Sequence, residues 1–330
     1  MGSLLPVGEP LKKIKKKMKT NKLRLSITDQ CQFSCLYCRG GRAKSNSSKG
    51  RILEAFEIVN ICQSLVKFWG IDEIRITGGE PTLRKDLLSI VEALNALPLR
   101  KLAITTNGLF TPKLLSELKN YHCNYINFSL DSLREDRFRE ISRGKEGCEQ
   151  FKLVRSNIEE AIALGFKVRI NCVLLRGVND DELPGFMDFS REHGVEVRFL
   201  ELIRIGKALE EFNQYYIPAK EVEERIYQSY DVISEERVPS STAYYLITKE
   251  GAKIGFITPE SCAFCNHCTR LRLDQYGNLR TCLMDIQGIN LAGASESEIC
   301  MMYPMVMEIK EQRRHAGRRS SSNRMDEIGG

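Results

Sequence analysis

The stretch LRLSITDQCQFSCLYC, residues 23–38, joins an alternating apolar run to three closely spaced cysteines. Leu23 to Thr28 has the period of a strand, and Cys31, Cys35 and Cys38 follow at once with C-x3-C-x2-C spacing. Three thiolates on one short loop can bind three corners of a cubane [4Fe-4S] cluster, and no fourth cysteine follows nearby. The spacing predicts a cluster with one open iron. The alternative is structural zinc, although zinc sites usually pair such a knuckle with a second one.

The rest of the first two thirds of the chain alternates between strand and helix patterns. Besides the first run, apolar and β-branched residues predict strands at 73–77, 101–105, 125–130, 168–174 and 195–200. Helical spacing lies between them at 52–68, 85–97, 112–121, 148–164 and 181–193. This order predicts an α/β fold with a parallel sheet and right-handed crossovers, in the form of an incomplete (β/α)6 barrel.

The expected organisation has four parts. A basic tail at 1–22 precedes the barrel at 23–208, and a C-terminal region at 209–307 is expected to close the open side of the barrel. That region includes a short hairpin around Tyr244 to Phe256. Composition predicts a disordered basic tail at 308–330, which ends in Gly-Gly. Because chemistry in such barrels lies at the C-terminal ends of the strands, the loops after the strands should face one pocket.

Composition excludes several classes of protein. The 330 residues are 42% hydrophobic and 28% charged, which is typical of a globular protein. No apolar run approaches the roughly 20 residues of a membrane-spanning helix, and the N-terminus lacks the pattern of an export signal. Twelve cysteines in a chain expected in the cytoplasm favour metal binding over disulfides. The net charge of +6 suits a polyanionic substrate as well as nucleic acid, so charge alone does not decide between them. We expect neither membrane nor nucleic acid as a partner.

A second set of cysteines lies near the C-terminus. Cys265, Cys268 and Cys282 have C-x2-C-x13-C spacing, which could again leave one iron of a [4Fe-4S] cluster open. Cys262 is a possible fourth ligand, which could complete the cluster or make the site one for zinc.

The motifs together resemble a known family. CQFSCLYC followed by TGGEP resembles the radical S-adenosylmethionine (SAM) superfamily. Within it, LRLSITDQC, RITGGEPTLRKDL, TTNG, NFSLDSL, GVNDDEL, VRFLEL and RLRL resemble the GTP 3',8-cyclase family, also called molybdenum cofactor biosynthesis protein A. The resemblance runs from Leu23 to about Leu283 and resumes at the terminal glycines.

The resemblance implies two [4Fe-4S] clusters, bound by Cys31, Cys35 and Cys38 and by Cys265, Cys268 and Cys282, together with SAM. It places on the SAM side Tyr37, Gly78, Gly79, Glu80, Ser129, Arg198 and Ile203. Contacts to GTP are implied for Arg24, Arg75, Thr105, Arg169, Arg270, Leu271 and Arg272. Catalytic roles are implied for Arg270, Arg272, Gly329 and Gly330.

The implied reaction converts GTP to 3',8-cyclo-GTP in the first step of molybdenum cofactor biosynthesis. Implied partners are a cyclic pyranopterin monophosphate synthase downstream, a low-potential donor such as flavodoxin or ferredoxin, and a second copy in a homodimer. The sequence departs from the family pattern at Glu73, Arg169, Ile203 and Thr269. A radical SAM enzyme acting on another substrate, such as a peptide maturase, is therefore the alternative. A second alternative, which is not an enzyme, is a non-catalytic iron-sulfur carrier or a zinc-dependent nucleic-acid-binding module.

Overall fold

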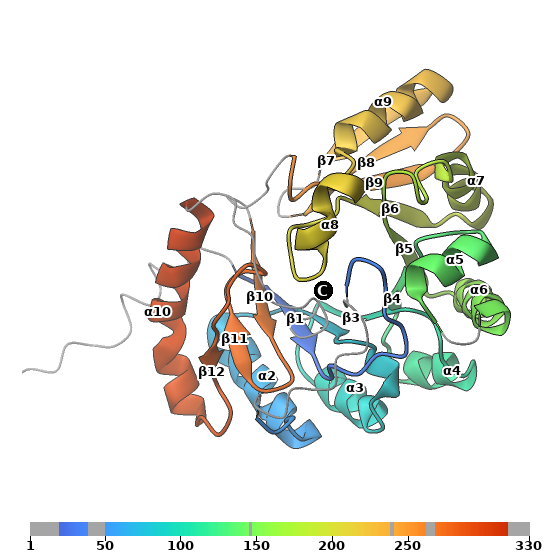
Figure 1. Ribbon diagram of the computed structural model, residues 1–330. Coiled ribbons are helices and arrows are strands. Elements are labelled where there is room, and N and C mark those ends of the chain that lie inside the picture. The colour runs from blue at the N-terminus through green and yellow to red at the C-terminus, as the bar shows by residue number, and fades with distance from the viewer. Residues whose placement is uncertain (1–19, 39–49, 145–146, 238–240, 262–267, 316–330) are drawn as a thin grey trace, which may run out of the picture.

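The computed structural model describes residues 20–38, 50–144, 147–237, 241–261 and 268–315. Its strands form a single curved sheet in the order β12-β11-β10-β1-β2-β3-β4-β5-β6-β9-β8-β7 (Figure 1). The strands from β10 through β6 to β9 are all parallel. The predicted α/β class with a parallel partial barrel is confirmed.

The six predicted strands and five predicted helices are all present, with small shifts at their ends. The strands are β1 (Lys22–Ser26), β2 (Glu73–Thr77), β3 (Lys101–Thr106), β4 (Tyr125–Ser129), β5 (Lys167–Val173) and β6 (Glu196–Leu200). The helices are α2 (Ala55–Trp69), α3 (Leu87–Asn95), α4 (Lys113–Asn120), α6 (Gly147–Ala163) and α7 (Leu183–His193). Sequence analysis missed α5 (Glu135–Ser142) and the 3-10 turn η1 (Pro81–Leu83).

The C-terminal region adds elements at both edges of the six-stranded sheet. Beside β6 lie α8 (Ala208–Tyr215), α9 (Ala219–Ser229), β7 (Val232–Arg237), β8 (Ala243–Thr248) and β9 (Lys253–Ile257). Beside β1 lie β10 (Arg270–Leu273), β11 (Asn278–Arg280), β12 (Ile289–Asn290) and α10 (Glu296–His315). The predicted hairpin corresponds to the antiparallel pair β8 and β9. One segment of chain thus supplies both flanks of the barrel.

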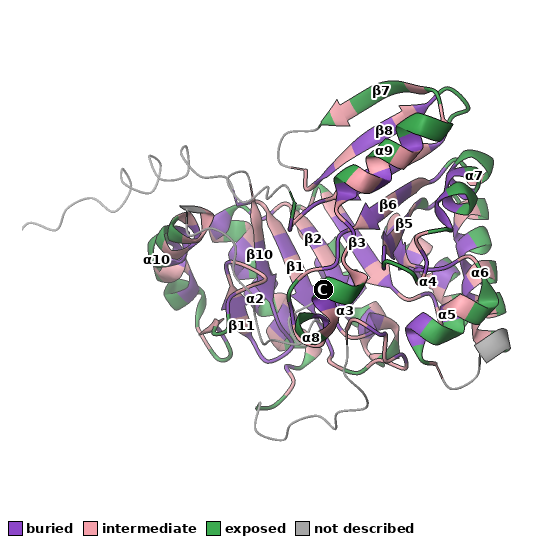
Figure 2. Ribbon diagram, turned by 45° about the horizontal axis from the view of Figure 1, so that its top comes forward, coloured by how far each residue is buried: buried purple, intermediate pink, exposed green. Residues whose placement is uncertain are grey.

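The two faces of the sheet differ in chemistry. Along β5 and β6 the residues alternate between fully buried and partly exposed. The buried set, which includes Ile170 and Val197, packs in the main hydrophobic core, and helices cover this outer face (Figures 1 and 2). The alternate set, which includes Arg169, Glu196 and Arg198, lines a cavity on the inner face. Because strand side chains alternate with a period of two, one strand serves the core and the cavity together.

The prediction that residues 308–330 form a disordered tail is wrong for 308–315, because α10 continues through them. One side of α10 packs on α2. There Trp69 Nε1 donates to the Ile299 carbonyl at 3.0 Å, and the Trp69 ring packs edge-on against Tyr303. Composition could not reveal that the helix continues, since residues 308–315 are nearly all charged or polar. None of the helices in the described ranges is long and apolar enough to cross a bilayer.

Candidate active site

A cavity of about 490 Å³ lies inside the partial barrel. Its lining runs from the cysteine loop after β1 to the first residues of the strands, such as Lys22, Glu73 and Lys101. The prediction of a pocket at the C-terminal ends of the strands therefore describes one end of a longer cavity. We call the part around Cys31, Cys35 and Cys38 the thiol end, and the part lined by arginines and lysines the cationic end.

Helix α5, which the sequence did not reveal, holds the cysteine loop. The Ser34 amide donates to the Ser142 carbonyl at 3.0 Å, and the Leu36 amide donates to the Ile141 carbonyl at 2.8 Å. Phe33 packs edge-on against Phe138 of α5, with ring centroids 5.6 Å apart. The loop that carries the three thiols is thus tied to a helix about 100 residues further along the chain.

The glycine pair after β2 has a packing role. A Cβ on Gly79 would lie 2.3 Å from the Gln30 carbonyl oxygen, and one on Gly78 would lie 2.5 Å from that of Thr28. The Gly79 amide donates to Thr28 at 2.7 Å, and the Glu80 amide donates to Gln30 at 2.7 Å. Only glycine permits this approach of two backbones. The pair therefore fixes the start of the cysteine loop, in addition to any contact with SAM.

Glu80 joins two of the loops around the thiol end. Its buried carboxylate accepts hydrogen bonds from the Thr82 amide and hydroxyl, the Thr106 hydroxyl and the Asn107 amide. Burial raises the pKa of Glu80. Asn107 in turn reaches the Cys31 Sγ at 3.8 Å. Glu80, predicted on the SAM side, is placed by these contacts as the support of the loop after β3.

Tyr37 and Asp131 link the cysteine loop to the loop after β4. The Tyr37 hydroxyl donates to Asp131 Oδ2 at 2.8 Å, and the Val173 amide donates to Oδ1 at 2.8 Å. Burial raises the pKa of Asp131 to about 6. Tyr37 thus lines the cavity with its hydroxyl anchored, and its contact with SAM stays a prediction.

The three thiols fit a multi-iron cluster better than a single ion. All three line the cavity, and burial together with the neighbouring Cys38 and Asp131 raises the pKa of Cys35. Within the described ranges, no three His, Cys, Asp or Glu side chains converge closely enough to bind one metal ion. In a cubane each thiolate binds a different iron, so the thiols need not converge. The donor set, three thiols with no fourth cysteine nearby, is that of a cluster with one open iron.

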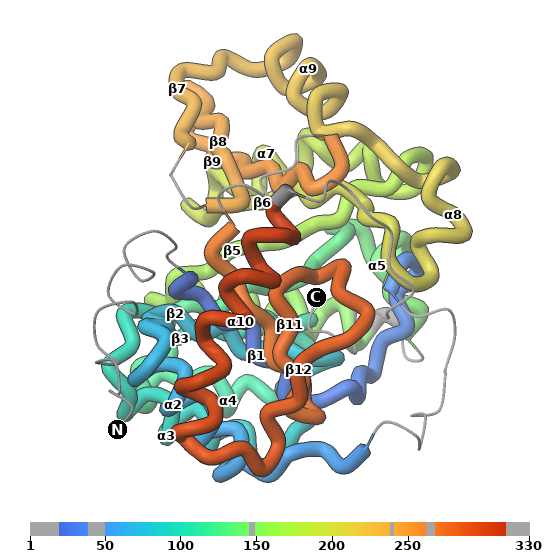
Figure 3. Tube along the Cα trace, turned by 90° about the vertical axis from the view of Figure 1, so that its left-hand side faces the viewer, coloured from blue at the N-terminus to red at the C-terminus, as the bar shows by residue number. Residues whose placement is uncertain are grey.

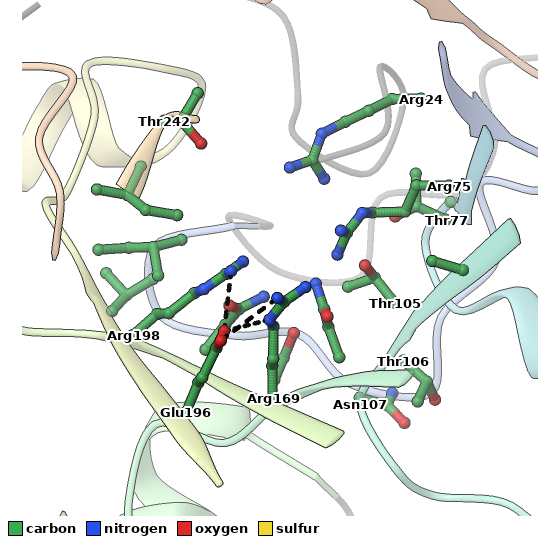
Figure 4. A pocket seen from close by; sticks show the side chains of 18 of the residues that line it. Arg24, Arg75, Thr77, Thr105, Thr106, Asn107, Arg169, Glu196, Arg198 and Thr242 are labelled. Carbon is green, nitrogen blue, oxygen red and sulfur yellow. Dashed lines mark hydrogen bonds and ion pairs between the residues drawn. The ribbon is translucent and has the colours of Figure 1, made fainter. Parts of the chain in front are cut away.

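Arginines from several strands meet at the cationic end. Arg24, Arg75, Arg169 and Arg198 project into the same space from β1, β2, β5 and β6 (Figure 4). Burial lowers the pKa of Arg75 to about 9, and the charges of Arg198 and Arg169 add to the shift. Burial also lowers the pKa of Arg24, with Arg272 and Arg75 adding to it. Without a ligand these cations repel one another, which is the electrostatic signature of a polyanion site.

Glu196 offsets part of this charge. Its carboxylate pairs with the Arg169 guanidinium and accepts a hydrogen bond from Arg198 Nη2 at 3.2 Å (Figure 4). Tyr245 of β8 donates to Glu196 at 3.0 Å and contacts Arg198 through its hydroxyl. Burial raises the pKa of Glu196, but the hydrogen bond and charge of Arg169, the charge of Arg198 and the hydrogen bond from Tyr245 together outweigh burial and lower the pKa below its usual value. Arg169 and Arg198 are therefore held at fixed positions before any ligand binds.

Several buried polar atoms facing the cavity have no hydrogen-bond partner among the described residues. They are Arg75 Nη1, Thr105 Oγ1, Asn127 Oδ1, Asn171 Oδ1 and Arg198 Nε. Leaving such an atom unpaired costs about 1–3 kcal/mol. Both donors and acceptors are among them, as recognition of a ligand with mixed polar groups requires. These atoms support a polar ligand in the middle of the cavity.

Two lysines lie at the far rim of the cationic end. Burial lowers the pKa of Lys101 to about 7, and the charges of Arg169 and Arg75 add to the shift. Burial also lowers the pKa of Lys22. Glu73, a departure from the family pattern, forms an ion pair with Arg100 and lies 3.9 Å from Lys22, so its charge is offset.

Cys268 and Cys282, the described members of the second cysteine set, lie at the opposite end of the strands from the first set. Cys268 precedes β10, whose Arg270 pairs in register with Lys22 at the start of β1, whereas Cys31 follows the end of β1. Burial raises the pKa of the Cys268 thiol, but Arg270 and Lys310 outweigh it and lower the pKa to about 6. Arg270 also lines the cavity. The second set therefore meets the cavity through Arg270. Cys262 and Cys265 lie outside the described residues.

Most of the predicted site residues come together. The cavity lining includes Tyr37, Gly78, Gly79, Glu80, Ser129 and Arg198, as well as Arg24, Arg75, Thr105, Arg169 and Arg270. Arg272 is buried beside Arg270, and burial lowers its pKa to about 10. The side chain of Leu271 lies in the hydrophobic core and Ile203 does not line the cavity, so the structure does not place these two with the others. Gly329 and Gly330 lie outside the described residues.

Sequence analysis missed several residues of the cavity. Lys22, Lys101, Asp131 and Glu196 each lie two positions along a strand or its end from a residue that faces the cavity. The strand period could have found them. Tyr245, which also lines the cavity, carries no such signal, because tertiary packing alone brings it there.

The comparisons with known proteins agree with this geometry. Residues 25–190 match the Radical SAM superfamily, and residues 195–316 match the family Molybdenum Cofactor Synthesis C. GTP 3',8-cyclase of Clostridium botulinum is 36% identical over 276 residues, covering 83% of this chain and 84% of that protein. The chain belongs to the GTP 3',8-cyclase family. The Synechocystis member is 36% identical over 311 residues, covering 94% and 92% of the two chains. As a member of the radical SAM superfamily, the chain uses SAM and a [4Fe-4S] cluster.

Solved structures support the fold. A crystal structure of Streptococcus suis SuiB bound to S-adenosylmethionine superposes with a TM-score of 0.64, covering 91% of this chain and 70% of that chain at 17% identity. A structure of anSMEcpe with bound AdoMet and a peptide gives a TM-score of 0.53, covering 90% and 84% at 12% identity. At such identities the likeness extends to the fold and no further.

Proposed function

We propose that this chain is a GTP 3',8-cyclase that converts GTP to 3',8-cyclo-GTP, the first step of molybdenum cofactor biosynthesis. The single observation that carries the proposal is the cationic end of the cavity, where arginines from separate strands meet within one cavity that also contains the radical SAM thiols. Family relatives named GTP 3',8-cyclase that align over most of the chain support it. The reaction is placed in the cytoplasm.

At the thiol end, Cys31, Cys35 and Cys38 would bind the first [4Fe-4S] cluster. SAM bound there would supply the radical chemistry that removes a hydrogen atom from the substrate. The chain's own residues hold the loops in place: Gly78 and Gly79 fix the start of the cysteine loop, and Asp131 fixes Tyr37. This rigidity limits the positions that the reactive group can occupy.

At the cationic end, Arg75 and its neighbours would bind the triphosphate. A guanidinium offers a planar pair of donors to phosphate and keeps its charge at neutral pH. Because Glu196 already orients Arg169 and Arg198, little side-chain freedom remains to be lost on binding. Binding a polyanion also relieves the repulsion among the arginines.

Cys265, Cys268 and Cys282 would bind a second [4Fe-4S] cluster, and Arg270 and Arg272 would contact GTP between that cluster and the cavity. A nucleotide bound in this way would lie between the two thiol sets, with its ribose toward the thiol end. The contribution of the protein is then orientation of the substrate more than acid–base chemistry. Gly329 and Gly330, which lie outside the described residues, are proposed to reach the same site.

The test is an anaerobic assay of the reconstituted protein with SAM, dithionite and GTP. We expect 5'-deoxyadenosine together with a cyclised guanine nucleotide. When ATP replaces GTP, we expect only trace amounts of either product. If 5'-deoxyadenosine forms equally without GTP and no nucleotide product appears, the substrate assignment is wrong, although SAM cleavage would stand. In the cell, we propose, a cyclic pyranopterin monophosphate synthase consumes the product, and a low-potential flavodoxin or ferredoxin is the reductant.

A further inference from the structure

The last turns of α10 bring a buried lysine to the second cysteine set. Lys310 is 3% exposed, and its Nζ donates to the carbonyl oxygens of Arg270 and Thr281, each at 2.7 Å. The same nitrogen lies 3.6 Å from the Sγ of Cys268. Figure 3 shows α10 running alongside β11, whose end leads to Cys282. One ammonium thus joins the two segments that carry Cys268 and Cys282.

Two neighbouring arginines support the same region. Arg314 Nη2 donates to the carbonyl of Cys268 at 2.8 Å, and Arg313 Nε pairs with Asp285 Oδ1 at 2.5 Å. The other oxygen of Asp285 accepts from the amides of Thr281 and Cys282. The basic face of α10 therefore contacts the chain on both sides of the described thiol pair.

We propose that Lys310 is a positioning residue for the second cluster, which fixes the separation of Cys268 and Cys282 and directs its ammonium at the Cys268 sulfur. The inference rests on the second cluster of the proposed function and adds a role for the helix that follows it. It concerns residues beyond the cysteine motif, in a segment whose composition predicts a tail.

The hydrogen-bond partners of the Lys310 ammonium explain why it should act on the cluster. An ammonium has three donors, and here three acceptors surround it. Two of them are neutral carbonyls, so the thiolate is the partner that offsets the buried charge. Hydrogen bonds and positive charge at cluster sulfurs raise the reduction potential of the cluster. Lys310 should therefore make the second cluster easier to reduce, whereas a purely structural lysine would leave the potential unchanged.

The experiment is a redox titration of the second cluster, monitored by electron paramagnetic resonance in the full chain. A Cys35→Ala background removes a thiol of the first cluster, so that about four irons per chain and one signal remain. In that background, Lys310→Met should lower the ratio of reduced to oxidised cluster at a fixed potential about tenfold, a shift of about 59 mV to more negative values. Lys310→Arg, which keeps the charge, should recover most of the shift.

The control is Lys67→Met, which removes an exposed lysine paired with Glu296 at the other end of α10. It should leave the potential unchanged. Equal potentials for Lys310→Met and the parent, at equal iron content, would overturn the proposal. If Lys310→Met loses the iron, retention by Lys310→Arg supports the proposal and loss there overturns it.

The assay with GTP separates this inference from the proposed function. If the wild-type chain forms no cyclised nucleotide but Lys310→Met still shifts the reduction potential, the choice of substrate is wrong and the role of Lys310 stands. A chain that makes the nucleotide but shows no shift would do the reverse.

Discussion

The two ends of the cavity are built on opposite principles. At the thiol end the polar groups satisfy one another: Glu80 accepts from two loops, and Asp131 accepts from Tyr37 and the Val173 amide. At the cationic end, buried atoms of Arg75 and Arg198 lack partners among the described residues, and burial lowers the pKa of both side chains. At the first end, protein contacts alone hold the loops that carry the thiols, whereas at the second end buried polar atoms remain to be paired by a ligand.

The two ends therefore differ in what determines their specificity. The thiol end depends on backbone geometry, because glycine contacts and carboxylate bridges fix the positions of the loops. The cationic end depends on charge, because cations from separate strands approach one another against their mutual repulsion. Substitutions at the thiol end should act through shape, and those at the cationic end should follow charge and pH.

The largest expected effect is that of Gly79→Ala. The added Cβ would lie 2.3 Å from the Gln30 carbonyl oxygen and 2.7 Å from its carbonyl carbon, so the cysteine loop must move. We expect SAM cleavage to fall to background and iron to drop by about half, to about four per chain. Iron analysis and 5'-deoxyadenosine formation measure this.

The matched control for that change is Gly185→Ala in α7, where the nearest atom to an added Cβ, on Leu133, is at 3.4 Å. It should retain full iron and activity. GTP binding should survive in Gly79→Ala, because the cationic end does not depend on the glycine pair. Loss of GTP binding there would show that the two ends are not separable.

Arg75→Met should have the next largest effect, on the other end. A hydrogen bond to a charged group is worth about 1.5–3 kcal/mol, so GTP affinity should fall about tenfold to a hundredfold. Calorimetric titration with GTP gives the affinity, and the affinity for SAM should be unchanged. Arg176→Met, which removes an arginine paired with Glu221 on the surface, is the control. An Arg75 variant that binds GTP as tightly as the control would contradict the role of the cationic end.

The sequence predicted the parallel barrel because its signals are local. Strands such as Glu73–Thr77 show their period within five residues, and glycine and cysteine motifs follow them directly. The cavity arginines were predicted for a different reason: they carry motif positions that a family resemblance transfers. The alternation of β5 and β6 then required their side chains to share a face.

What the sequence could not predict depends on contacts between distant segments. Helix α5 has few apolar residues, so its sequence shows no clear helical period. Its Ser142 carbonyl nevertheless holds the cysteine loop. Lys310 lies in a segment whose composition is that of a tail, and only the packing of α10 on α2 brings it to Cys268. Glu196 was within reach of the strand period, but its pairing with Arg169 required the register of β5 against β6.

The smallest expected effect, and the one that bears most directly on charge, is the pH dependence of GTP binding through Lys101. Burial and the neighbouring arginines lower its pKa to about 7, whereas a bound triphosphate would favour the protonated form and raise the pKa again. Binding then takes up a proton above pH 7 and takes up little below it. Affinity should therefore fall as pH rises from about 7 to 8, by at most about tenfold for one proton. Titrations in buffers of different ionisation enthalpy measure the uptake, and Lys101→Met should abolish this component while the ionisation of the nucleotide itself remains. A wild-type chain that takes up no more protons than Lys101→Met would mean that the triphosphate does not reach the rim, and that the cationic end binds its ligand through the inner arginines alone.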